Sequence, residues 1–292
     1  MWILKSIARL AVDTFTFQLL FLAMSDKPVI YSQYYPPGVK RVLASGTSSW
    51  IGEVNETTVL KYSLDLEGKD RIRLEIERKI LEAIGPHPRI IGLKGYTDIG
   101  IYLERATKGT LADYILNSDI APPSILQRLS WCREIAEGLA HIHRKRALHC
   151  DLQPTNVLLD GDLHIKISDF QGRLLSLDSE EVLLDGWSGE PCRFFCPRDD
   201  IFYANQKTDI FALGCTIYFI MMGHAVFPDI SDNEDGWRQK VEDRFANYHF
   251  PDDEHACCDI TSKCFHQQYD SAEEIVQEIA TVEEKLAAAG QR

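Results

Sequence analysis

The chain has 292 residues, of which 45% are apolar, and it carries a formal net charge of −13 at pH 7. This length and apolar content suffice for a packed core in one large domain or two lobes. The acidic balance argues against nucleic acid, which requires a basic patch, and against an anionic membrane surface as a partner.

Residues 1–27 form an apolar N-terminal extension, in which Lys5 and Arg9 are interspersed. A spanning helix needs about 20 nearly uncharged residues, so these charges disfavour a membrane span. A signal peptide would take its apolar stretch from residues 15–24 but would have a weak cleavage site. We expect an added amphipathic segment or an over-extended start of the gene, with membrane attachment only if residues 1–24 are retained as an anchor.

Residues 41–64 predict two strands around a turn, VLASGTSS followed by TTVLKYS. In residues 70–84 three isoleucines recur on one helical face, and the Gly-Pro pair that follows is a helix stop signal. Two more short strands are predicted for RIIGLKGY and IGIYLERA, which a Thr-Asp turn separates. The first part of the chain is therefore expected to be mainly sheet with one helix.

After Gly109 the pattern becomes helical. A Pro-Pro-Ser sequence at 122–124 opens a run in which apolar residues recur at helical spacing. Residues 147–170 hold short strand-like pieces around a polar loop. Residues 208–222 are almost wholly apolar but too short to span a membrane, which predicts a buried central helix. A capping-box pattern, Ser and then Glu three residues later, begins a last helix at residue 271.

The eight cysteines follow no repeat, and none occurs before residue 132. This distribution is a poor match to a disulfide framework, so we expect reduced thiols in a cytoplasmic protein. Three cysteines and two histidines cluster near the C-terminus: His255, Cys257, Cys258, Cys264 and His266. Zinc is the alternative for this cluster, but zinc ligands usually occur as pairs at two- to four-residue intervals on each arm. We favour buried cysteines beside exposed histidines.

Phosphoryl transfer requires a phosphate cradle, cations, oxygen ligands for Mg²⁺ and a base that orients the acceptor. The stretch HCDLQPTN carries Asp151 and Asn156 on one loop as a candidate base and metal ligand, and ISDFQG adds Asp169 as a second ligand. Lys61 ends an apolar run and can reach phosphates, and Glu77 on the predicted helix could hold that lysine. Each residue is a weak signal alone, but their order favours a phosphotransferase.

With these motifs the sequence resembles the eukaryotic protein kinase family, and within it the divergent kinases of filamentous fungi, over about residues 40–285. The likeness rests on GTSSWIGEV at the glycine-rich loop, VLK at the lysine strand, ERKIL in the αC helix, HCDLQPTN at the catalytic loop, DFQG at the metal-binding motif and KTDIFALG at the central helix. It implies an α+β, bilobal, protein-kinase-like fold. The β-rich N-lobe with its αC helix would span residues 28–106, the α-rich C-lobe residues 107–285, and a C-terminal tail residues 286–292.

The resemblance implies a serine/threonine-protein kinase that uses ATP and Mg²⁺ and phosphorylates a protein substrate. Asp151 would be the catalytic base, with Gln153 beside it, and Asn156 and Asp169 would bind the metal. The resemblance also places nine residues around the nucleotide: Gly46, Gly52, Val54, Val59, Lys61, Glu77, Leu103, Glu104 and Ala106.

Two supporting elements follow from the same resemblance. Asp209, at the start of the central helix, would anchor the backbone of the catalytic loop. A hydrophobic stack would tie the two lobes together, and its members would be Leu81, Leu93, His149 and Phe170.

The segment that follows the metal-binding motif departs from the family pattern. Cys150 replaces the arginine that in many kinases receives a phosphate, and residues 170–197 contain no Tyr or Thr but five acidic residues. We therefore expect no requirement for phosphorylation there. Arg198 stands where the family has a glutamate, and the arginine that usually pairs with that glutamate is missing too. Losing only one partner of this ion pair would leave an uncompensated charge, which costs about 3–5 kcal/mol. We therefore interpret the loss of both partners as a tolerated structural swap.

Three further departures concern catalysis. Gln153 replaces a lysine that contacts the transferring phosphate, and the loss of one such preorganised donor lowers rates by about 10²–10³. Ser48 replaces the middle glycine of the glycine-rich loop, and Gln171 replaces the glycine that lets the metal-binding segment flip. These changes favour nucleotide binding over fast catalysis and leave open an ATP-binding pseudokinase that acts as a scaffold.

A third alternative is a small-molecule phosphotransferase of the aminoglycoside or choline type. The pattern H-x-D-L-x-P-x-N fits those enzymes as well. DFQG and KTDIFALG fit protein kinases better, so we rank this alternative last.

Overall fold

The computed structural model describes residues 35–63 and 68–289, which belong to one unit of the chain. The expectations for the extension at residues 1–27 lie outside the described residues. Within the described residues, no helix combines the length and the apolar character needed to cross a membrane.

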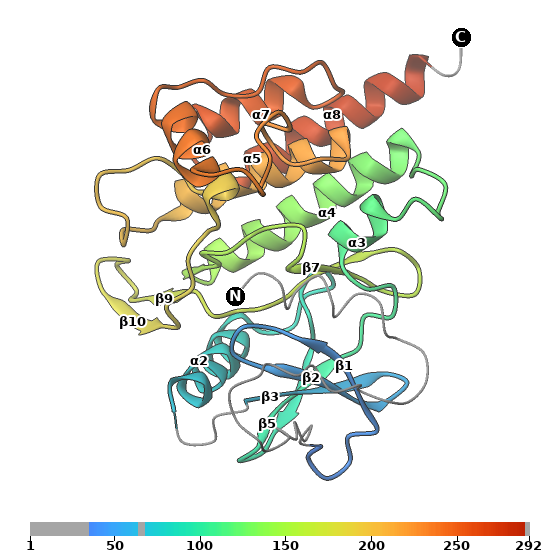
Figure 1. Ribbon diagram of the computed structural model, residues 1–292, viewed down its shortest axis with the longest axis vertical. Coiled ribbons are helices and arrows are strands. Elements are labelled where there is room, and N and C mark those ends of the chain that lie inside the picture. The colour runs from blue at the N-terminus through green and yellow to red at the C-terminus, as the bar shows by residue number, and fades with distance from the viewer. Residues whose placement is uncertain (1–34, 64–67, 290–292) are drawn as a thin grey trace, which may run out of the picture. The chain divides into compact units, whose positions relative to one another are not determined.

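A five-stranded antiparallel sheet forms the first part of this unit, with the strand order β1-β2-β3-β5-β4 (Figure 1). Its strands are β1 (Arg41–Ser45), β2 (Trp50–Asn55), β3 (Thr58–Tyr62), β4 (Leu93–Tyr96) and β5 (Gly100–Glu104). The single helix of this part is α2 (Lys69–Ile84), which packs against β3, β4 and β5 and ends at Gly85 with a φ of 73°. The expected mixture of sheet and one helix is confirmed.

The prediction of two strands within residues 41–64 was wrong, because the structure has three. The strand β2 was missed because Gly52 and Glu53 interrupt the apolar alternation of WIGEVN. A Cβ atom on Gly52 would lie 2.6 Å from Cγ1 of Val39, so glycine is needed here for close packing.

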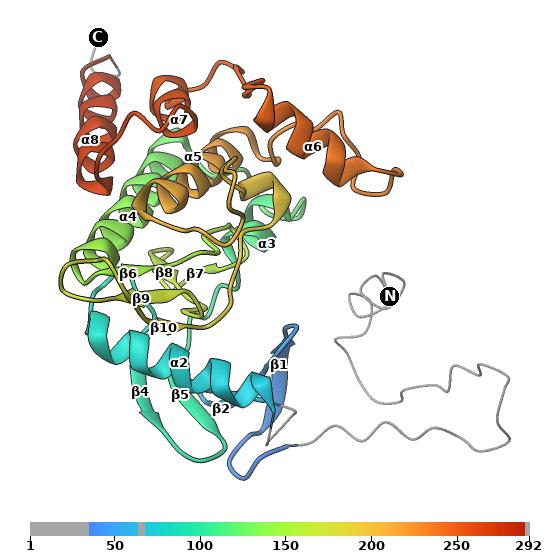
Figure 2. The ribbon, with the colours of Figure 1, turned by 90° about the vertical axis from the view of Figure 1, so that its left-hand side faces the viewer.

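The second part of the unit is rich in helices (Figures 1 and 2). Its helices are α3 (Leu111–Leu116), α4 (Ile125–Arg144), the 3₁₀ turn η1 (Cys192–Phe194), α5 (Gln206–Met222), α6 (Trp237–Ala246), α7 (Cys258–Phe265) and α8 (Ala272–Ala289). Its short strands are β6 (Ala147–Leu148), β7 (Val157–Leu159), β8 (Ile165–Ile167), β9 (Arg173–Leu175) and β10 (Val182–Asp185). The α+β class is therefore confirmed.

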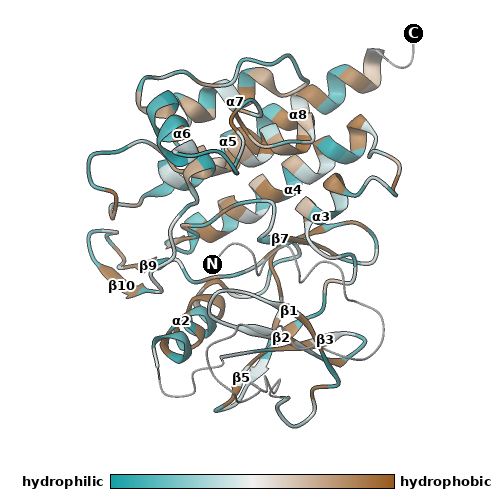
Figure 3. Cartoon of the chain, viewed as in Figure 1, coloured by the Kyte–Doolittle hydropathy of each residue, from teal (hydrophilic) through white to brown (hydrophobic). Residues whose placement is uncertain are grey.

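Helix α5 is the expected central helix of the second part. Every residue from Thr208 to Ile220 is buried, and α4 and α7 pack against α5. Figure 3 colours the chain by hydropathy. The helix begins with a capping box between Asn205 and Thr208, and it ends at Gly223 in the left-handed conformation. Both ends are thus fixed by local sequence.

The eight cysteines are all free thiols, and most of them are buried. Among the residues that the structure describes, no group of three or more His, Cys, Asp or Glu side chains is arranged to hold a metal ion. In the C-terminal cluster, Cys257 and Cys264 are buried, whereas Cys258 and His266 are exposed.

The packing of α5 against α7 can be tested at a glycine in α5. A Cβ atom on Gly214 would lie 2.5 Å from Cβ of Cys264 on α7. Overpacking costs about 1–3 kcal/mol and the gain in helix propensity returns about 1 kcal/mol. The net cost is then about 0–2 kcal/mol, so we expect Gly214→Ala to lower the free energy of unfolding in urea by about 1 kcal/mol. The control Gly189→Ala, where a Cβ meets nothing within 4 Å, should leave it nearly unchanged. Equal stability of the two variants would contradict the packing.

Candidate active site

A buried lysine links the sheet, the helix α2 and the segment after β8. Lys61 lies on β3 opposite Ile101 of β5, which directs its side chain toward α2. Its Nζ donates to Oε2 of Glu77 at 2.6 Å and to Oδ1 of Asp169 at 2.7 Å. The lysine and glutamate side chains are 6% and 0% exposed, whereas the Asp169 side chain is 39% exposed. The ion pair expected between Lys61 and Glu77 is present.

The two carboxylates beside this ammonium differ in their electrostatics. Burial lowers the pKa of Lys61, but the negative charges of Asp169 and Glu77 outweigh burial and hold that pKa above its ordinary value. Burial raises the pKa of Glu77, against the opposing effect of Lys61. Asp169 keeps access to solvent, so the lysine outweighs partial burial and lowers its pKa. Asp169 therefore carries its negative charge most readily and faces outward.

The loop between β6 and β7 gathers two polar side chains around one carboxylate. Nε2 of Gln153 donates to Oδ1 of Asp151 at 2.6 Å, and Nδ2 of Asn156 donates to Oδ2 of Asp151 at 2.9 Å. The Asn156 amide nitrogen also donates to the backbone oxygen of Asp151 at 2.8 Å. These contacts orient the amide so that its oxygen, a potential metal ligand, points away from Asp151.

The carboxyl group of Asp151 titrates in the physiological range. Burial and the negative charge of Asp169 raise its pKa to about 7, although Asn156 and Gln153 both donate hydrogen bonds to it. A group with such a pKa is suited to accept a proton near neutral pH. The effect of Asp169 on Asp151 also shows that the two carboxylates belong to one electrostatic site.

Asp209, at the start of α5, fixes the backbone of this loop. Its Oδ2 accepts from the backbone N of His149 at 2.8 Å and faces Nε2 of His143 at 3.0 Å, and its Oδ1 accepts from the backbone N of Cys150 at 2.9 Å. Cys150 adopts a φ of 60°, a strained conformation that these bonds help to hold. The anchor expected at Asp209 is therefore present.

The loop is also tied to the segment that carries Asp169. The backbone N of Ser168 donates to the backbone O of Asn156 at 2.9 Å. The rings of His149 and Phe170 lie 5.2 Å apart, and Leu81 is buried, while Leu93 is only partly buried. Backbone bonds and ring packing thus hold the two halves of the site together.

The residues expected around the nucleotide lie mainly on the sheet. Val59 is opposite Leu103 in the β3–β5 register, and Val54 and Ala106 are partly buried. The carboxylate of Glu104 accepts from the backbone N of Gly92 at 3.1 Å and pairs with Nζ of Lys166 at 3.1 Å. The Glu104 side chain therefore ties β5 to the segment before β4 and to β8, so only its backbone would remain for the expected contact with a nucleotide.

The two expected glycines differ in their surroundings. Gly46 lies in the turn between β1 and β2, where its backbone N donates to the backbone O of Ser49 at 2.8 Å. Gly52 lies within β2 and faces Val39 and Tyr62, so packing accounts for it. Of the two glycines, Gly46 is the one that lies in an exposed turn.

The segment from Gln171 to Arg198 contains ion pairs of its own. Arg173 on β9 pairs with Asp185 on β10 at 3.0 Å. Arg198 pairs with Glu190 at 2.9 Å, and the Glu190 side chain is only 2% exposed. This pair was not predicted from the sequence, because Arg198 and Glu190 come together only through the folded path of the segment.

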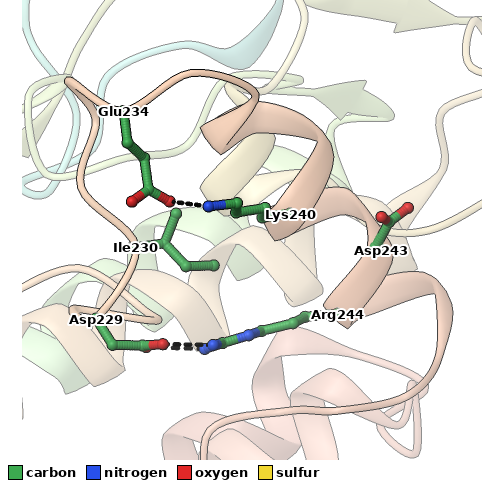
Figure 4. A pocket seen from close by; sticks show the side chains of 6 residues that line it. All are labelled: Asp229, Ile230, Glu234, Lys240, Asp243 and Arg244. Carbon is green, nitrogen blue, oxygen red and sulfur yellow. Dashed lines mark hydrogen bonds and ion pairs between the residues drawn. The ribbon is translucent and has the colours of Figure 1, made fainter.

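A surface hollow of about 370 Å³ beside α6 is a separate feature (Figure 4). Its cations are already neutralised within the hollow, because Lys240 pairs with Glu234 at 2.8 Å and Arg244 pairs with Asp229. None of the predicted site residues lines it.

Comparisons with known proteins agree with this geometry. The sequence profile of the protein kinase domain matches residues 53–279. The chain is 29% identical over 193 residues to the serine/threonine-protein kinase kin-29 of Caenorhabditis elegans. The aligned region covers 62% of this chain and 22% of that protein. It is 28% identical over 204 residues to the serine/threonine-protein kinase GIN4 of Saccharomyces cerevisiae. The aligned region covers 68% of this chain and 16% of that protein. The chain thus spans less than a quarter of the length of these relatives.

The anchor at Asp209 leads to a prediction about stability and pH. Burial raises the pKa of Asp209, but the interactions with His143 and His149 together outweigh burial and hold the folded-state pKa below its ordinary value. A lowered pKa stabilises the folded state above the unfolded pKa, and this stabilisation is lost as pH falls through the folded value. Asp209→Asn should lower the free energy of unfolding at pH 7 by about 2–4 kcal/mol, because an amide cannot accept all three bonds.

The measurement is urea unfolding of wild type and variant between pH 7 and pH 3. The difference should stay constant down to about pH 5 and shrink below about pH 4. The control Asp162→Asn changes an exposed aspartate and should have little effect at any pH. A difference that grows as the pH falls would contradict the assignment.

Proposed function

Since this chain belongs to the protein kinase family, we propose that it is an active kinase, which transfers the γ-phosphate of ATP to a Ser or Thr hydroxyl of a protein substrate. The observation that carries the proposal is the position of Lys61, which contacts both Glu77 and Asp169. A lysine so held presents a fixed positive charge to phosphates. The names of the curated relatives support Ser/Thr as the acceptor type.

The oxygen atoms at one end of the site fit Mg²⁺. Asp169 offers a carboxylate that is charged and partly exposed, and Asn156 offers an amide oxygen that Asp151 does not use. Mg²⁺ prefers one or two such oxygens together with phosphate and water. When bound, the ion would neutralise negative charge on the phosphates. The protein's part is to hold these two oxygens through the Ser168–Asn156 backbone bond and the contact with Lys61.

The remaining roles follow from the same geometry. Asp151 would accept the proton of the substrate hydroxyl, for which a pKa of about 7 is suited. Gln153 would orient that carboxylate through its 2.6 Å hydrogen bond. The sheet residues Val54, Val59, Leu103 and Ala106, with the backbone of Glu104 and the Gly46 turn, would bind the nucleotide. Glu77 would hold Lys61.

Two finer assignments belong to this proposal. The free thiols support a cytoplasmic location. The likeness to the divergent kinases of filamentous fungi rests on the sequence motifs alone. Attachment to a membrane would depend on residues 1–24.

A catalytically silent, ATP-binding pseudokinase is the second candidate. The observation that favours it is the neutral amide of Gln153 on Asp151, at a point where the family places a positive charge. This candidate shares nucleotide binding with the first and differs in phosphate transfer. The two are therefore separated by measuring both quantities on the same protein.

Nucleotide binding is tested by thermal unfolding. At about 100 times its dissociation constant, Mg-ATP should raise the melting temperature by about 5–10 °C. Lys61→Met should remove most of this shift, because it removes the charge that faces the phosphates. The control Lys94→Met, on the exposed side of β4, should keep it. The absence of any shift in the wild-type protein would contradict the proposal.

Phosphate transfer is tested with labelled ATP and a generic protein acceptor. Asp151→Asn should abolish transfer and retain the Mg-ATP shift, because only the proton acceptor is lost. Gln153→Lys should raise the rate by about tenfold to 10², since it supplies the missing charge. Nucleotide binding without transfer in both the wild type and Gln153→Lys would favour the pseudokinase.

A further inference from the structure

Gln171 follows Phe170 and makes a contact that the proposed roles do not use. Its side chain is buried, and Nε2 donates to Oε2 of Glu77 at 3.3 Å. That same oxygen accepts from Nζ of Lys61 at 2.6 Å. A neutral amide and a charged ammonium therefore converge on one oxygen of a fully buried carboxylate.

The backbone around Gln171 is fixed on its other side. Its N donates to the backbone O of Asp169 at 3.0 Å, and its O accepts from the backbone N of Ser188 at 3.2 Å. A Cβ atom on Gly186 would lie 2.3 Å from the Gln171 oxygen, so the two backbones are in close contact. Gln171 has a negative φ, so a side chain is accommodated here without strain. The side chain thus starts from a rigid base.

Glu77 needs this second donor. It has no exposed surface, its Oε1 has no partner in the described residues, and the only cation that contacts it is shared with Asp169. Burial raises the pKa of Glu77, and both Lys61 and Gln171 oppose that rise. A buried carboxylate that loses donors is costly, because its charge is then poorly compensated.

We propose that Gln171 is a positioning residue, whose amide holds the Glu77 carboxylate, and with it α2, in the arrangement that presents Lys61 to the phosphates of ATP. The expected effect on nucleotide binding rests on the proposed function. The expected effect on the stability of α2 does not depend on that function. The contact spans α2 and the segment after β8, so it joins the two parts of the unit. It acts without any phosphate on residues 170–197.

The test uses the full chain and a double-mutant cycle. Gln171→Met keeps the length of the side chain and removes its donors, and Gln171→Gly restores the residue of the family pattern. Each is made in the wild type and in Glu77→Met, which leaves no acceptor for the Gln171 amide. Gln239→Met is the matched control, because it removes another glutamine–carboxylate bond, the 2.9 Å contact with Asp243 on exposed α6.

Two readouts are taken well below the melting temperature of each variant. The first is amide hydrogen exchange in residues 69–84, which requires no nucleotide. The second is the dissociation constant for Mg-ATP. Gln171→Met and Gln171→Gly should each raise exchange in α2 and weaken Mg-ATP binding by about tenfold. In the Glu77→Met background neither change should add a further effect. Gln239→Met should alter neither readout.

The outcomes separate this inference from the proposed function. If the wild type does not bind Mg-ATP, the proposed function fails, and hydrogen exchange in α2 still decides the role of Gln171. Unchanged exchange in both Gln171 variants would overturn the inference, even if nucleotide binding is intact. Effects that multiply with those of Glu77→Met would overturn it too, because Gln171 would then act by another route. If Gln171→Met fails to fold, the cycle with Gln171→Gly gives the same decision.

Discussion

The ammonium of Lys61, shared by the carboxylates of Glu77 and Asp169, is the interaction on which the rest of the site depends. Removing these charges from water is favourable only when they are paired with good geometry, so the pairing fixes three elements at once: β3, α2 and the segment after β8. Because Glu77 has no exposed surface, α2 cannot move away without leaving a buried charge unpaired. The apolar packing of the sheet and α2 therefore serves to place one positive charge.

Carboxylates organise the catalytic side of the molecule in the same way. Asp209 binds the backbone of the loop before Asp151, and Glu190 neutralises Arg198 in the segment that follows the metal-binding motif. With the pair between Arg173 and Asp185, these contacts order residues 170–198 using charges that the chain already carries. The loss of a phosphate receptor at Cys150 and the gain of internal ion pairs are thus two aspects of one arrangement.

The sequence predicted the elements whose signals are local, and the residues whose order is diagnostic. The helix with Glu77, the apolar helix α5 and the contacts of Lys61 and Asp209 all followed from spacing and family likeness. The strand β2 escaped because Gly52 serves packing across the sheet rather than alternation. The pairing of Arg198 with Glu190 and the contact between Gln171 and Glu77 also escaped. Each joins residues whose proximity depends on the folded path of the chain, which no local pattern encodes.

We expect the chain's own charges to assemble a working site without phosphorylation. The most direct measurement is the initial rate of phosphate transfer by protein that has been treated with phosphatase and verified by mass spectrometry to carry no phosphate. The account predicts a rate equal to that of untreated protein, with no lag. A lag that ends as Ser176, Ser179 or Ser188 becomes phosphorylated, or activity only after such phosphorylation, would contradict it.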